Sequence, residues 1–75
     1  MVKKDLHGIK HEDARREVIH FVEDHWDSEE PIYIVTGWST KMSKIVKEVL
    51  DEYKLDYQDG DELGFNKGFI KVKLP

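Results

Sequence analysis

Two short motifs carry the side chains that could do chemistry, and the first is Asp5-Leu6-His7-Gly8. Its carboxylate and imidazole are two positions apart, so at a strand end they project to one face or around one turn. A carboxylate that hydrogen-bonds an imidazole fixes its tautomer and raises its basicity. Asp5 and His7 are therefore candidate catalytic residues. The alternative is that Asp5 bonds nearby backbone N–H groups and locks the turn, with His7 as a packing residue.

The second motif is Thr36-Gly37-Trp38-Ser39-Thr40, where an apolar run ends and a helical pattern begins. Gly37 can take backbone angles that other residues avoid, which allows a sharp reversal. The free N–H groups at the start of the next helix can hold an anion. Trp38 is flanked by small and polar residues, so we expect an exposed ring on which a base could stack. The alternatives are a turn that serves geometry alone, or a Trp38 ring folded over the sheet edge.

The two turns and the lysines after the second one form a candidate surface for a phosphate and a base. Its residues are Gly8, Thr36, Gly37, Trp38, Ser39, Lys41 and Lys44. The lysines belong to a run in which Lys41, Lys44 and Lys47 recur at every third position, and an ordinary solvated helix face would show the same pattern.

Composition limits the possible classes of protein. With 75 residues the chain is expected to be one domain, residues 1–75, with a small core. The net charge of −4 counts against a generic nucleic-acid coat protein. No apolar run approaches membrane-spanning length, the N-terminus lacks a signal-peptide pattern, and there is no cysteine. We therefore expect a cytoplasmic protein without membrane partners.

The histidines suggest a metal site only weakly. His20 and Asp24 are four positions apart in a helical pattern, but the other two histidines of that segment, His11 and His25, fall on different faces. A zinc site needs ligands that converge from a few positions. No compact acidic cluster of the kind that holds magnesium for phosphodiester cleavage is evident either. The sequence predicts neither a metal nor a cofactor.

Hydrophobic periodicity predicts six elements in the order β-α-β-α-β-β. The expected strands are Lys3–Leu6, Ile32–Val35, Leu55–Gln58 and Phe69–Leu74, and the expected helices are His11–Trp26 and a segment from near Lys41 to Tyr53. Helical crossovers predict parallel pairing among the first three strands, and a short connection predicts an antiparallel last pair. The expected fold class is mixed α/β, a two-layer α+β fold. It has a four-stranded mixed sheet with two helices on one face. Alternating Lys71 and Lys73 favour an edge position for the last strand.

This order and these residues resemble the small MutS-related (Smr) domain. That family opens with a D-L-H-G or D-x-H motif, matched here by Asp5-Leu6-His7-Gly8, and its second strand ends in H-G-x-G or T-G-x-G, matched by Thr36-Gly37-Trp38-Ser39. The glycine and alternating strand at the chain end correspond to residues 68–74. The resemblance covers residues 3–74, and two motifs at the correct turns of the correct topology are more specific than either alone.

The resemblance implies a fold like the C-terminal domain of translation initiation factor three. It implies binding of RNA or branched DNA, endonuclease activity in many members, and action at ribosomes in some. Two departures matter: Thr36 replaces the imidazole of the H-G-x-G form, and Ser39 replaces the second glycine. Two functions stay open, a nucleic-acid endonuclease and a non-catalytic module that binds nucleic acid, a ribosome or a protein. In the first, a metal-independent route through the ribose 2′-hydroxyl is expected.

Overall fold

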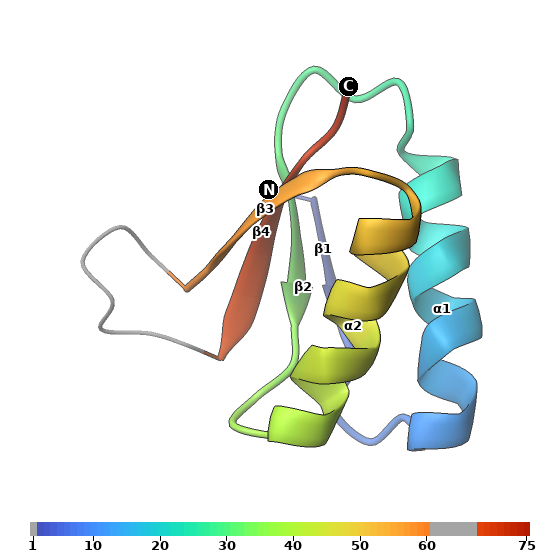
Figure 1. Cartoon of the computed structure of the whole chain (residues 1–75), viewed down its shortest axis with the longest axis vertical. Helices are drawn as coiled ribbons and strands as arrows, with labels where there is room; N and C mark the ends of the chain where they lie inside the picture. Colours follow the sequence, from blue (N-terminus) through green and yellow to red (C-terminus); the bar gives the residue numbers. More distant parts are fainter. Residues whose placement is uncertain (1, 61–67) are drawn as a thin grey trace.

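The computed structural model describes residues 2–60 and 68–75 (Figure 1). The elements are β1 (Val2–Asp5), α1 (His11–Asp24), β2 (Ile32–Val35), α2 (Thr40–Glu52), β3 (Asp56–Asp59) and β4 (Phe69–Lys73). This order confirms the predicted two-layer α+β fold with a four-stranded mixed sheet and two helices. The first helix ends two residues before the predicted Trp26. The amide of His25 bonds the carbonyl of Val22, three residues back, which tightens the chain into a turn.

The strand order is β1-β2-β4-β3, and it corrects two predictions. β1 and β2 pair in parallel as expected, but β3 does not pair with β2. β4 lies between them and is antiparallel to both, so it is a central strand and not the predicted edge. The crossover through α2 leaves one strand position open between β2 and β3, and β4 fills that position when the chain returns.

Both helices cover the same face of the sheet, with α2 beside α1 (Figure 1). Apolar residues at spacings of three and four form the buried stripe of each helix. Fully buried strand residues face these stripes, and β2 and β4 supply most of them. The main contacts of this core come from Val18, Val22, Val46, Val49, Leu50, Ile32, Ile34, Ile70 and Val72.

The pairing of β1 with β2 determines where the two motifs lie. Asp5 is opposite Val35, and the amide of Leu6 donates to the carbonyl of Val35 at 2.9 Å. Because the two strands are parallel and in this register, the turns that follow them leave the sheet at the same end. This confirms that Asp5, His7 and Gly37 lie at one end of the sheet.

Within residues 2–60 and 68–75, neither helix is long and apolar enough to cross a membrane.

Candidate functional site

The turn after β1 is held by the carboxylate of Asp5. Its Oδ1 accepts a hydrogen bond from the backbone N–H of His7 at 2.8 Å. The amide of Ile9 closes the turn onto the carbonyl of Leu6 at 3.0 Å, and Gly8 takes a φ of +82°, which favours glycine. Asp5 thus bonds backbone, as in the alternative set out above. His7 is exposed, however, so its imidazole is open to a ligand.

The turn after β2 is fixed by the carbonyl of Gly68 at the start of the returning chain. This oxygen accepts from the amide of Thr36 at 2.8 Å and from the amide of Gly37 at 2.9 Å. Gly37 has a φ of +64°, and a Cβ there would meet nothing within 4 Å, so glycine is required by conformation and not by space. Its amide is already bonded and cannot be given to an anion.

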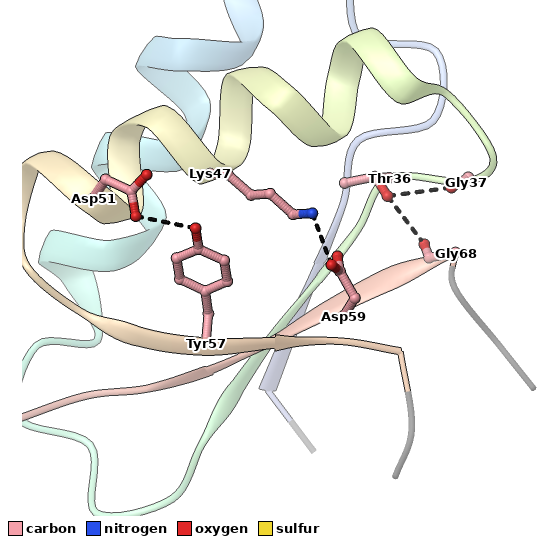
Figure 2. Close-up of polar contacts among 7 residues, drawn as sticks. All are labelled: Thr36, Gly37, Lys47, Asp51, Tyr57, Asp59 and Gly68. Carbon is pink, nitrogen blue, oxygen red and sulfur yellow. Dashed lines mark hydrogen bonds and ion pairs between the residues drawn. The ribbon is translucent and has the colours of Figure 1, made fainter. Parts of the chain in front are cut away.

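Thr36 is turned into the protein. Only 8% of its surface is exposed, and its hydroxyl lies 3.2 Å from the carbonyl oxygen of Gly37 and 3.4 Å from that of Gly68 (Figure 2). A threonine here satisfies main-chain acceptors that an apolar residue would leave with fewer partners. Thr36 therefore has a structural position, with its hydroxyl pointing at the turn.

The start of α2 supplies the amides that an anion could use. Ser39 caps the helix, since its Oγ accepts from the amide of Met42 at 3.1 Å. No described residue accepts a hydrogen bond from the amides of Thr40 or Lys41. These two amides lie at the positive end of the helix dipole. The helix start at which the sequence predicts an anion therefore offers these two amides, whereas the amide of Gly37 is occupied.

Trp38 is 78% exposed, which confirms the predicted open ring and excludes packing over the sheet edge. A shallow pocket adjoins it between the start of α2 and the end of β3. Its lining residues are Gly37, Trp38, Ser39, Thr40, Ser43, Lys47 and Asp59. Ring, pocket and unpaired amides are thus neighbours on one surface, because consecutive residues of the turn contribute all three.

The lysines of α2 are not equivalent. Lys41 and Lys44 are exposed and form no ion pair with any described residue. Lys47 is half-buried, and its Nζ lies 2.7 Å from Oδ2 of Asp59 (Figure 2). Asp59 comes directly after the predicted strand Leu55–Gln58. Its contact with α2 depends on where β3 lies in the sheet, and no local pattern could have revealed it.

A second contact joins β3 to α2 further along the helix. The hydroxyl of Tyr57 donates to Oδ1 of Asp51 at 3.0 Å (Figure 2). Burial, and then this hydrogen bond, raise the pKa of the Tyr57 phenol. Together with the pair of Lys47 and Asp59, this bond holds β3 against the outer side of α2.

In the parts of the chain that the structure describes, no group of three or more histidines and carboxylates could hold a metal. Among the candidate ligands, His25 contacts its own helix, with Nδ1 2.9 Å from the carbonyl of Phe21.

No protein-family model matches this chain, and neither does any curated protein sequence.

Proposed function

We propose that this domain binds nucleic acid, RNA or branched DNA, at the sheet end where the two turns meet. The observation that carries the proposal is the 78% exposed ring of Trp38, two positions before the amides of Thr40 and Lys41, which bond no described residue. A large exposed aromatic has no evident value for folding and gives a base a flat face. The first turn of α2 then accepts the adjoining phosphate.

Charge near the ring favours the same ligand. Lys41 and Lys44, which form no ion pair within the described part of the chain, add two cations to a chain of net charge −4. Binding is then local and strongly dependent on salt. The resemblance of both motifs to the Smr family supports the proposal, which includes a ribosome as the carrier of the RNA and the cytoplasm as the location.

The test compares two tryptophans. In Trp38→Ala, loss of one stacked base weakens binding of labelled single-stranded RNA or branched DNA by about 1–3 kcal/mol. The matched control is Trp26→Ala. Trp26 is 37% exposed and its ring centroid lies 5.8 Å from that of Tyr53, so its loss lowers stability and leaves binding unchanged. Fluorescence anisotropy and thermal unfolding measure the two effects. Normal binding by Trp38→Ala would refute the proposal.

A second candidate function, cleavage of RNA, is favoured by the position of His7. His7 is exposed and follows the end of β1, beside the turn of Gly37 that follows β2. As a general base, His7 takes the proton of a ribose 2′-hydroxyl, whose oxygen attacks the neighbouring phosphorus. The bond to the 5′-oxygen breaks, and that oxygen leaves with a proton from water. Asp5 holds the turn through the backbone of His7.

The cleavage test uses labelled RNA in EDTA, and the expected product ends in a 2′,3′-cyclic phosphate. A general base contributes about 10²–10⁴-fold, so His7→Ala loses most of the rate and keeps most of the affinity. His11→Ala is the control, because His11 is exposed at the start of α1. A need for divalent ions, or full activity in His7→Ala, would exclude this route. Binding without any cleavage would support the alternative, a non-catalytic binding module.

A further inference from the structure

The side of the sheet that faces away from the helices carries its own set of polar and aromatic residues. Side chains alternate along a strand, so the neighbours of the buried Ile32, Ile34, Ile70 and Val72 point to this side. No described helix covers it (Figure 1). We call it the open face, and its residues are Lys3, Asp5, Tyr33, Val35, Asp56, Gln58, Phe69, Lys71 and Lys73.

The strand register aligns four of these residues in one row across the sheet. Lys3 is opposite Tyr33, Tyr33 is opposite Lys71, and Lys71 is opposite Gln58. The row thus places an aromatic ring between two lysines, with an amide at its end. Such a row offers stacking to a base and charge to the phosphates on either side of it.

Phe69 connects this row to the site at Trp38. Its ring centroid lies 5.8 Å from that of Tyr33, with an angle of 63° between the planes. Phe69 is also opposite Val35, the last residue of β2 before the Gly37 turn. The open face and the turn therefore adjoin, because β2 carries Tyr33 and leads directly into the turn.

The charge of the open face differs from that of the chain. Lys3, Lys71 and Lys73 form no ion pair with any described residue. The acids on this side are Asp5 and Asp56, at two corners of the sheet. The three lysines outnumber the two acids of this face by one, on a protein of net charge −4. A second copy of the chain would bring lysine rows together, whereas a polyanion complements them.

Tyr33 also differs from the other described tyrosines in its hydroxyl. The hydroxyl of Tyr53 donates to Glu23 at 2.8 Å and that of Tyr57 donates to Asp51 at 3.0 Å. No described residue bonds the hydroxyl of Tyr33. This hydroxyl and the amide of Gln58, on strands separated by β4, can each donate to or accept from a ribose 2′-hydroxyl, the group that distinguishes RNA from DNA.

We propose that the open face binds single-stranded RNA, with bases stacked on Tyr33 and Phe69 and phosphates beside Lys3 and Lys71. This inference deepens the proposed function, because the strand continues from Phe69 to the turn at Trp38. It narrows the ligand to an unpaired strand, since the bases of a duplex are stacked on each other and cannot lie flat on these rings.

The experiment measures binding of three labelled probes: a mixed-sequence single-stranded RNA, DNA of the same sequence, and that RNA paired with its complement. Tyr33→Leu and Phe69→Leu remove the aromatic face and keep apolar bulk. Each is expected to weaken RNA binding about 5- to 150-fold, the range that one stacked base supplies. Lys71→Gln is expected to lower the salt dependence by about 0.7 per phosphate contact. Arg16→Gln, on the exposed side of α1, is the charge-matched control and leaves binding unchanged.

Thermal unfolding first establishes that each variant is folded. Preference for single-stranded RNA, lost in the open-face variants and kept in Arg16→Gln, supports the proposal. Equal binding of DNA or duplex, or normal binding by Tyr33→Leu and Phe69→Leu, overturns it. The proposal is also overturned if the protein is a dimer in solution and the open-face variants are monomers. The same measurements separate the two proposals. If only Trp38→Ala loses RNA binding, the ligand binds at the turn and not on the open face. If only the open-face variants lose RNA binding, the ligand binds on the open face and not at the turn.

Discussion

Lys47 and Asp59 form an ion pair, with 2.7 Å between Nζ and Oδ2, that joins α2 to the end of β3. The two side chains are 33% and 48% exposed, and both line the pocket beside Trp38. The third lysine of the run in α2 is therefore neutralised by a residue twelve positions away. An acid at this place lowers the positive charge of the pocket that the proposed ligand would enter.

Asp59→Asn is expected to strengthen nucleic-acid binding because it frees Lys47 for a phosphate. The logarithm of affinity should then depend on salt more steeply, by about 0.7–0.9 for one added phosphate contact. Stability should fall by no more than about 1 kcal/mol, since the ion pair is partly exposed. Asp27→Asn, in the exposed turn after α1, is the control for net charge. An unchanged salt dependence in Asp59→Asn would show that no phosphate reaches this pocket.

Loss of the cap at Ser39 should destabilise the protein. In Ser39→Ala the amide of Met42 loses its acceptor, at a cost of about 1 kcal/mol, which corresponds to about 4–8 °C in Tm. Ser39→Asp keeps an acceptor and should retain the stability of the parent. Thr40→Ala is the neighbouring control, because the side chain of Thr40 does not cap the helix. A Tm in Ser39→Ala equal to that of the parent would contradict the capping role.

Gly37→Ala should be destabilising through backbone strain alone. The φ of +64° costs an alanine roughly 1–2 kcal/mol, and a Cβ would meet no atom within 4 Å. Gly37→Asn should cost less, since asparagine tolerates this conformation better than alanine. Urea unfolding measures both variants. Equal losses in the two would indicate a steric cause in place of a conformational one.

The raised pKa of Tyr57 predicts how the stability of the protein changes at alkaline pH. Burial first, and the hydrogen bond to Asp51 second, raise its pKa above the ordinary 10.0, so the folded protein holds this proton more tightly than the unfolded chain. The stabilisation is complete below pH 10.0 and is lost as the pH rises through the raised pKa. Urea unfolding across this range should show the loss, and Tyr57→Phe should reduce it. An identical pH dependence in the variant would remove Tyr57 as the cause.

Local patterns were sufficient for the elements and for both turns. Apolar stripes at helical spacing predicted α1 and α2, because burying such a stripe is what stabilises a short helix. Glycine after a strand predicted the reversal at Gly37, and its polar neighbours predicted the exposed ring of Trp38. Parallel pairing of the first two strands brought the two turns to one end, as expected.

Contacts between distant segments decided the rest, because they depend on which strand fills which place in the sheet. Alternating lysines in β4 looked the same for an edge strand as for a central strand with one open face, and only the sheet order separated the two. The carbonyl of Gly68 accepts a hydrogen bond from the amide of Gly37, which lies 31 positions earlier in the chain. By itself the sequence determined the elements and the chemistry of each turn. The tertiary structure decided which of those groups are free to meet a ligand, since hydrogen bonds and ion pairs between remote residues occupy the others.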